Sequence, residues 1–225
     1  SELAGRLLFG NKTYNQGKVT IIKNAIDIDK FKFNVDNRKV IRNEFNVLDN
    51  EILIGNVGRM MPQKNQAFLI KVFAKYHKIN LNTKLMIIND GPLLQALQAL
   101  AKELNVFDSV IFVGPKADLY KYYSAFDLFT LPSIYEGLGI VLIEAQANGL
   151  KCIASMNVPT EVDGTGNIEF VKLDEDEWLK TLIRVSYSRN EWNDCRDKLI
   201  AAKYDIDEAA KELEVIYRQT LKSNK

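Results

Sequence analysis

Short apolar runs alternate with amphipathic stretches along most of the chain, and a turn follows each apolar run. In the stretches between the runs, apolar residues recur every three or four positions, as they do in a helix that packs on one face. Strands that alternate with such helices form a parallel sheet with right-handed crossovers. The pattern therefore predicts an α/β fold whose strands cover residues 52–57, 84–89, 110–113, 127–131 and 151–155.

Both ends of the chain extend this plan. Residues 19–23 are expected to form a further short strand, and residues 168–171 fit an edge strand. The remainder is helical, with segments near 175–188, 190–202 and 205–222. We expect a doubly wound, mostly parallel Rossmann-like sheet of about six strands with extra C-terminal helices.

The composition suits a globular protein and disfavours nucleic acid as a partner. The chain has 225 residues, of which 47% are hydrophobic and 26% are charged. A net charge of +1 gives no overall field that would attract nucleic acid. The basic excess among the first 42 residues is expected to be a solvated face.

Cysteines, histidine and apolar runs limit the metal chemistry and the location that we expect. Cys152, Cys195 and the single histidine, His77, do not make a zinc set, and the two widely spaced cysteines fit a reducing cytoplasm. No apolar run approaches the roughly 18 residues that span a bilayer, and the N-terminus does not resemble a signal peptide. We therefore expect a cytoplasmic protein.

The most informative stretch is residues 131–149, where a strand gives way to a turn and then to a helix. Pro132 ends the strand because it has no amide hydrogen for the sheet ladder. Gly137 and Gly139 leave the turn without Cβ atoms, so backbone amides can approach a ligand closely. Since amides at a helix N-terminus bind anions, we expect an anion at this turn.

Two carboxylates, Glu136 and Glu144, flank this helix start. A carboxylate repels a phosphate, so both are better suited to accept hydrogen bonds from hydroxyl groups. We expect sugar hydroxyls at Glu136 and ribose hydroxyls at Glu144, which implies a nucleotide diphosphate sugar. The alternative interpretation is that Glu144 is a solvated helix residue and that Glu136 is a turn residue favoured by the helix dipole.

In open α/β sheets, ligands bind outside the carboxyl ends of the strands, so the other strand-to-helix turns are candidates as well. Arg59 and Lys64 follow the strand at 52–57, and two fixed cations there can neutralise a diphosphate without a metal. Lys116 follows the strand at 110–113 and can hold a flat base against its stem. The alternatives are two solvated cations in the first turn and a plain turn in the second.

Together these motifs resemble the C-terminal domain of retaining GT-B glycosyltransferases of family 4. The stretch from Glu136 to Gly149 is most similar to bacterial enzymes that build capsular polysaccharide or exopolysaccharide. The matching segments follow the family's order and are residues 24–27, 58–59, 64–65, 89–93, 112–114, 131–133 and the glutamate pair Glu136 and Glu144.

The resemblance implies metal-independent transfer of a sugar from a nucleotide diphosphate sugar, with UDP as the family's usual nucleotide, with retention at the anomeric carbon and without a cofactor. Arg59 and Lys64 would hold the diphosphate and stabilise the leaving group, and Glu136 would grip the donor sugar. Glu144 would bind the ribose and Lys116 the base. By this resemblance Arg59, Lys64 and Glu136 would be the catalytic residues. The other donor contacts would be Gly58, Gly91, Lys116, Gly137, Leu138, Gly139, Ile140 and Glu144.

The resemblance also implies a division of the chain. Residues 1–18 would be the remnant of an N-terminal domain and a linker, residues 19–204 the nucleotide-sugar-binding half of a GT-B fold, and residues 205–225 a helix that packs toward the missing domain. In the family that domain binds the acceptor, which we expect to be a saccharide or lipid-linked hydroxyl. We therefore expect residues 1–225 alone to bind donor nucleotide weakly without transferring sugar, and the full-length enzyme to associate peripherally with the inner face of the membrane.

Two other functions fit parts of the pattern. A GT-B-type nucleotide-sugar 2-epimerase would share the fold, but such enzymes use further carboxylates and histidines in the cleft, which this chain lacks. A non-catalytic nucleotide-sugar-binding module is the second alternative. The intact set of charged residues in the two turns argues against the loss of chemistry that this alternative requires.

Overall fold

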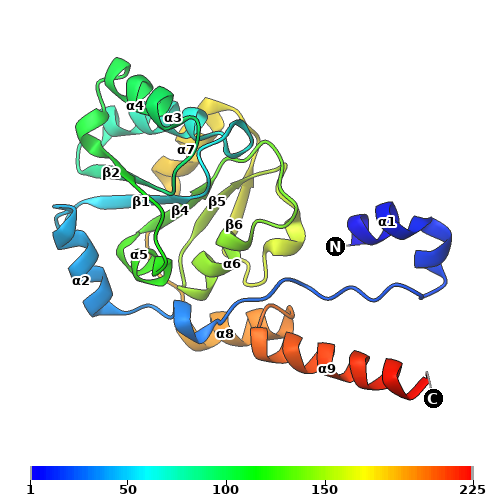
Figure 1. Ribbon diagram of the computed structural model, residues 1–225. Coiled ribbons are helices and arrows are strands. Elements are labelled where there is room, and N and C mark those ends of the chain that lie inside the picture. The colour runs from blue at the N-terminus through cyan, green and yellow to red at the C-terminus, as the bar shows by residue number, and fades with distance from the viewer. Residues whose placement is uncertain (1, 224–225) are drawn as a thin grey trace.

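The computed structural model describes residues 2–223, so residues 1, 224 and 225, at the ends of the predicted terminal segments, lie outside the described part of the chain. Six strands form one sheet in the order β3-β2-β1-β4-β5-β6, and each neighbouring pair is parallel (Figure 1). The predicted doubly wound α/β sheet is confirmed. The strands are β1 Ile52–Val57, β2 Thr83–Ile88, β3 Val110–Val113, β4 Leu128–Leu131, β5 Cys152–Ser155 and β6 Ile168–Val171.

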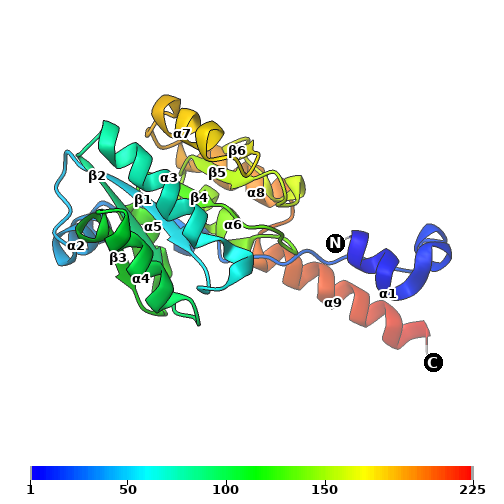
Figure 2. The same ribbon diagram turned by 90° about the horizontal axis from the view of Figure 1, so that it is seen from above.

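Helices cover both faces of this sheet (Figures 1 and 2). They are α2 Val35–Glu44, α3 Gln66–Ile79, α4 Leu94–Glu103, α5 Leu119–Ala125, α6 Ile140–Ala147, α7 Glu175–Arg184 and α8 Trp192–Ala201. On one face α3 contacts α4 and α7, and on the other α2 contacts α5 while α6 contacts α8. The molecule therefore has three layers, with the sheet in the middle.

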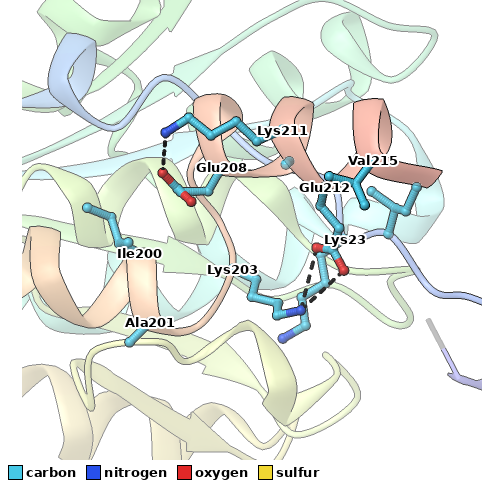
Figure 3. Close-up of a pocket in the computed structure, with 10 residues that line it drawn as sticks. Lys23, Ile200, Ala201, Lys203, Glu208, Lys211, Glu212 and Val215 are labelled. Carbon is cyan, nitrogen blue, oxygen red and sulfur yellow. Dashed lines mark hydrogen bonds and ion pairs between the residues drawn. The ribbon is translucent and has the colours of Figure 1, made fainter. Parts of the chain in front are cut away.

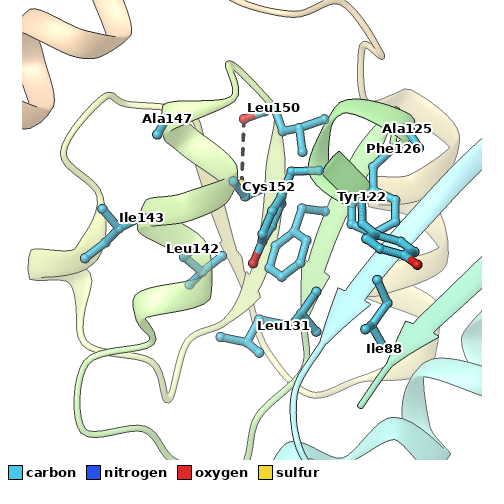
Figure 4. Close-up of a cluster of buried hydrophobic side chains, with 14 of the residues drawn as sticks. Ile88, Tyr122, Ala125, Phe126, Leu131, Leu142, Ile143, Ala147, Leu150 and Cys152 are labelled. Atoms are coloured by element: carbon cyan, nitrogen blue, oxygen red, sulfur yellow. Dashed lines mark hydrogen bonds between the residues drawn. The ribbon is translucent and has the colours of Figure 1, made fainter. Parts of the chain in front are cut away.

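Two apolar clusters fill the space between the sheet and its helices, one on each face. In the cluster on the α5 and α6 side, Ile88 of β2 lies with Leu131 of β4 and Leu142 of α6 (Figure 4). The central strands are buried on both faces, which explains why their sequences are almost continuously apolar. The edge strand β6 is more exposed, as predicted.

The order of the strands creates one special position between β1 and β4. After β1 the chain moves outward through β2 to β3, and it then returns to place β4 on the other side of β1. Helix α3 leaves β1 toward one face of the sheet, whereas α6 leaves β4 toward the other. Because the two connections diverge, the carboxyl ends of these two strands are the place where an open α/β sheet has its crevice and binds ligands.

The first and last helices extend away from the sheet (Figure 1). Helix α1, Glu2–Asn15, is kinked at Gly10, which has a φ of 78°, and α9, Ile206–Ser223, continues outward beyond α8. The predicted strand at 19–23 is wrong, because this segment is extended but pairs with no strand. The three-part division of the chain stays a prediction.

The predicted solvated basic face near the N-terminus is wrong at its last two arginines. Arg38 and Arg42, one turn apart on α2, both reach Asp127 just before β4, at 2.7 and 3.0 Å. The Arg42 side chain is only 2% exposed. The sequence gave no sign of this inward orientation, because the carboxylate lies 85 positions from Arg42.

Candidate functional site

The turn after β1 carries both predicted phosphate-binding cations. Lys64 lies in a 3-10 turn, Pro62–Lys64, and its stem folds back over the end of the strand. A Cβ atom on Gly58 would stand 3.4 Å from Cδ and Cε of Lys64, an ordinary van der Waals distance, so the stem of Lys64 packs directly against this glycine. The side chain of Arg59 is exposed and forms no ion pair with any residue in 2–223, which leaves it able to turn toward an anion.

The turn after β4 is bound directly to the turn after β1. The amide of Ile134 donates to the carbonyl of Gln63 at 2.8 Å, and Nε2 of Gln63 donates to the carbonyl of Tyr135 at 2.9 Å. These two hydrogen bonds hold the turns side by side at the crevice between β1 and β4. Sequence segments some 70 positions apart therefore form one surface.

Lys64 and Glu136 form an ion pair at the centre of this surface. Nζ of Lys64 lies 2.5 Å from Oε1 of Glu136, and the side chains are 17% and 7% exposed. The hydroxyl of Ser133 donates to the same carboxylate oxygen at 2.6 Å. A lysine ammonium has three N–H donors, so Lys64 keeps two for a further anion while it holds Glu136 in place.

The start of α6 adds backbone amides to the same crevice. Gly139 precedes the helix with a φ of 86°, a left-handed conformation that glycine adopts without strain. The first amides of a helix have no acceptor within the helix and carry the positive end of its dipole. Just before them, Gly137 and Leu138 line a cavity of about 290 Å³ together with Lys23 and Asn24.

Glu144 lies one helical turn beyond Ile140, on the same side of α6. The hydroxyl of Tyr123, a fully buried residue of α5, donates to Oε2 of Glu144 at 2.6 Å. Burial raises the pKa of the Glu144 carboxyl above its usual range, and the hydrogen bond from Tyr123 acts in the opposite direction. Burial, with the charge of Glu144, raises the pKa of the Tyr123 hydroxyl well above its usual range, so the hydroxyl stays a donor.

Gly91 contacts the site by packing against the backbone of Met60. It has a φ of 155°, and a Cβ atom at this position would lie 2.4 Å from the carbonyl oxygen of Met60. The amide of Met60 donates to the carbonyl of Asp90 at 2.7 Å, and the amide of Leu93 donates to the carbonyl of Met60 at 3.1 Å. The turn after β2 therefore supports the backbone next to Arg59.

Lys116 is the one predicted contact that lies well to the side. It follows β3, which is separated from β1 by β2, roughly 10 Å away at the usual spacing of strands. Its ammonium group lies 5.7 Å from the centre of the Tyr122 ring, and its hydrogen bond with Tyr122 raises the pKa of Lys116. The structure thus brings together the turns of Arg59, Lys64, Gly91 and Glu136, but it does not bring Lys116 into contact with them.

Two residues of the site were missed by sequence reasoning, Ser133 and Tyr123. In the sequence, Ser133 is only the last residue of the matching segment 131–133, and Tyr123 is only one of the residues of an amphipathic helical stretch. A signal was present for Tyr123, because a buried tyrosine hydroxyl normally finds a hydrogen-bond partner. The partner itself could not be read from the sequence, since Glu144 is 21 positions away on another helix.

A second cavity, of about 450 Å³, lies between α9, the end of α8 and Lys23 (Figure 3). Four of its charged side chains form two pairs, Lys211 with Glu208 at 2.7 Å and Lys203 with Glu212 at 3.3 Å, and Lys23 donates to the carbonyl of Ala202 at 3.2 Å. None of the predicted site residues lines this cavity. It adjoins the cavity at the start of α6, because Ile22 and Lys23 line both.

Residues 2–223 contain neither a metal-binding cluster nor a helix that could cross a bilayer. No group of three or more His, Cys, Asp or Glu side chains in this range could hold a metal ion. Among the helices of this same range, none combines the length and the apolar character that crossing a bilayer requires.

Comparison with known proteins identifies the family. The family model described as Glycosyl transferases group 1 matches residues 37–185, which is more than half of the chain. The chain belongs to this family. As a member of the glycosyl transferases group 1, it is a glycosyltransferase domain with the fold described above.

Individual relatives agree with this family membership. The chain is 35% identical over 191 residues to "Putative glycosyltransferase EpsF" of Bacillus subtilis, covering 82% of this chain and 49% of that protein. It is 28% identical over 201 residues to the Escherichia coli "UDP-Gal:alpha-D-GlcNAc-diphosphoundecaprenol alpha-1,3-galactosyltransferase", covering 81% of this chain and 50% of that protein. The chain thus spans about half the length of these curated relatives.

A solved structure shows the same fold. Anabaena Alr3699/HepE, crystallised in complex with UDP and glucose, superposes with a TM-score of 0.75 at 19% sequence identity. The superposition covers 93% of this chain and 60% of that chain. At 19% identity the similarity concerns the fold alone.

Proposed function

We propose that the chain is the C-terminal, donor-binding half of a retaining GT-B glycosyltransferase of family 4. It would take a UDP-sugar, without a metal, and serve transfer of the sugar to a hydroxyl of a saccharide or lipid-linked acceptor in the synthesis of a capsular or extracellular polysaccharide. The acceptor would be held by a further domain of the whole protein. The reaction would take place in the cytoplasm, at the inner face of the membrane.

The observation that carries the proposal is the junction of the two turns at the crevice between β1 and β4. Lys64 and Glu136 meet there at 2.5 Å, Arg59 is exposed in the turn that carries Lys64, and the amides of α6 begin at the end of the turn that carries Glu136. Cations and amides suit a diphosphate, whereas the carboxylates suit hydroxyl groups on either side of it. This alternation matches the order of sugar, diphosphate and ribose in a nucleotide sugar.

The proposed chemistry requires charge stabilisation more than proton transfer by the protein. The bond between the anomeric carbon and the diphosphate oxygen breaks, and the acceptor oxygen bonds to the same carbon on the same face. The proton of the acceptor hydroxyl passes to the leaving diphosphate. Negative charge develops on the phosphate oxygens, so preorganised positive groups, here Arg59, Lys64 and the α6 amides, are the main catalytic device.

The names of similar proteins support the choice of UDP. The E. coli relative is named for UDP-Gal and for a diphosphoundecaprenol acceptor, and the Anabaena protein was crystallised with UDP.

The 2-epimerase alternative, which needs histidines in the crevice, has no support from the structure. His77 hydrogen-bonds Thr83 at 2.9 Å, at the amino end of β2, and therefore lies at the opposite edge of the sheet from the crevice.

Arg59→Ala is expected to weaken binding of UDP by about 10- to 100-fold, because a hydrogen bond between charged groups contributes about 1.5–3 kcal/mol. Isothermal titration of the wild-type chain and the variant with UDP, GDP and ADP measures this effect and the nucleotide preference together. We expect UDP to bind most tightly.

Lys78→Ala is the matched control for this titration. Lys78 is an exposed cation in the last turn of α3, so the variant loses the same charge at the opposite edge of the sheet. Its affinity for UDP should equal that of the wild type. If Arg59→Ala binds UDP as tightly as Lys78→Ala does, the assignment of the diphosphate to this turn is wrong.

A further inference from the structure

The contact between Tyr123 and Glu144 links the donor crevice to the middle of the apolar core. The hydroxyl of Tyr123 donates to Oε2 of Glu144 at 2.6 Å and approaches the carbonyl of Val141 at 3.3 Å. The tyrosine belongs to α5 and the glutamate to α6, so the contact joins two helices on the same face of the sheet. Neither the family match nor the motifs of the two turns assign a role to Tyr123.

The ring of Tyr123 is held on several sides. Its centre lies 5.6 Å from that of Phe31 and 5.8 Å from that of Phe126, both in edge-to-face geometry, and 5.5 Å from that of Phe129. The residue is completely buried. Packing of this kind allows one rotamer, so the hydroxyl is a fixed donor and not a mobile one.

A fixed donor determines where the Glu144 carboxylate points. A glutamate on a helix surface samples several rotamers, and ordering it on ligand binding costs conformational entropy that weakens the binding. With Oε2 bound to Tyr123, this ordering has already taken place. Within residues 2–223, Oε1 has no hydrogen-bond donor, so it remains available to accept from a ligand.

We propose that Tyr123 is a positioning residue that makes the site selective for ribonucleotides, by holding Glu144 so that its free oxygen accepts hydrogen bonds from the two hydroxyls of the ribose. This inference rests on the proposed function, because it needs a nucleotide in the crevice. It adds a specificity-determining residue from the core, which touches the ligand only through Glu144. A purely structural tyrosine would stabilise the fold without affecting the choice between ribose and a sugar that lacks these hydroxyls.

The test compares UDP with 2′,3′-dideoxy-UDP, which keeps the base and the diphosphate but has no ribose hydroxyls. Dissociation constants are measured for the wild type and for Tyr123→Phe, which removes only the hydroxyl. We expect the wild type to prefer UDP by about 10-fold or more, since hydrogen bonds to a charged group are lost with the dideoxy ligand. In Tyr123→Phe the affinity for UDP should fall by about 10-fold, whereas the affinity for dideoxy-UDP should stay within about twofold of the wild-type value.

Tyr76→Phe is the matched control. The Tyr76 hydroxyl bonds that of Tyr187 at 2.6 Å on the α3 face, so this variant also loses a buried tyrosine hydrogen bond. It should change the affinity for neither ligand. Glu144→Gln supplies a second route to the answer that does not require Tyr123→Phe to fold, and it should lose UDP affinity while keeping that for dideoxy-UDP.

The outcomes separate this inference from the proposed function. If Tyr123→Phe lowers the affinity for both ligands equally, or leaves the affinity for UDP unchanged, the positioning role is wrong and the proposed donor site is unaffected. A wild type that binds UDP and dideoxy-UDP equally overturns the positioning role as well. A wild type that binds neither ligand overturns the proposed function and this inference together. In the double variant Tyr123→Phe/Glu144→Gln, the loss of UDP affinity should be smaller than the sum of the two single losses, because the two side chains act through one contact. This result would support the inference.

Discussion

Replacing Asp127 with alanine is expected to lower the free energy of unfolding by about 3–5 kcal/mol, because it leaves a buried guanidinium without its counter-charge. The carboxylate of Asp127 accepts from Arg38 at 2.7 Å, from Arg42 at 3.0 Å and from the amide of Leu53 at 2.8 Å. It therefore ties α2 to the amino ends of β1 and β4. The Arg42 side chain, 2% exposed, cannot regain water without moving the helix.

A third arginine makes this carboxylate still more important. Arg189 donates to the carbonyls of Tyr123 and Ser124, at 3.2 and 3.1 Å, near the end of α5. The pKa of Arg189 is lowered to about 9, mainly by burial and also by the charges of Arg38 and Arg42, whereas the charge of Asp127 acts in the opposite direction. Removing Asp127 thus leaves three cations close together with no anion among them.

Urea unfolding of Asp127→Ala and of the control Asp29→Ala measures the effect. Asp29 pairs with Arg196 at 2.8 Å, but its side chain is 68% exposed, and exposed pairs contribute about 0–1 kcal/mol. A loss for Asp127→Ala no larger than that for Asp29→Ala would contradict the account of the arginine cluster. Because Asp127 lies at the amino end of β4, the fraction that remains folded should bind UDP normally.

Gly91→Ala is expected to cost about 2–5 kcal/mol of stability and to weaken UDP binding in the protein that remains folded. The new Cβ atom would lie 2.4 Å from the carbonyl oxygen of Met60, and the φ of 155° is strained for alanine. Overpacking contributes about 1–3 kcal/mol, and the strained backbone adds a similar amount. Relief of the clash requires the backbone at Met60 to move, and Arg59 moves with it.

Gly137→Ala is the matched control, since both glycines were predicted as donor contacts. A Cβ atom on Gly137 meets nothing within 4 Å, and this residue does not have a positive φ. Thermal unfolding should therefore show little change for Gly137→Ala and a large fall for Gly91→Ala. Equal melting temperatures of the two variants would show that the turn after β2 does not support the turn after β1.

The sheet could be predicted from the sequence because its strands are buried on both faces. Short, mainly apolar runs such as 52–57 and 110–113 are typical of buried parallel strands, and their observed bounds agree with the predicted ones. The run at 19–23 looks similar but lies in an extended connection between α1 and the body of the molecule. An apolar run predicts a strand only where a partner strand is in reach, and the sequence does not show the partner.

The sequence predicts which turns form the site, but it does not predict which side chains contact each other there. Parallel strands end at one edge, so a glycine-bearing turn after β4 and cations after β1 were expected to converge there. Lys64 was expected at the diphosphate and Glu136 at the sugar, whereas the direct pair between them at 2.5 Å was not expected. The contact of Tyr123 with Glu144 and the arginines around Asp127 were missed for the same reason, since they join residues that are distant in sequence.

If the turns after β1 and β4 form a single pocket for the diphosphate of a nucleotide, amide NMR of the ¹⁵N-labelled chain during a titration with UDP will show it. We expect the largest shifts to occur together in residues 58–64 and 137–140, to saturate at one UDP concentration and to be lost in Arg59→Ala. Shifts confined to one of these turns, or shifts centred on the cavity beside α9, would show that the two turns do not form one diphosphate pocket.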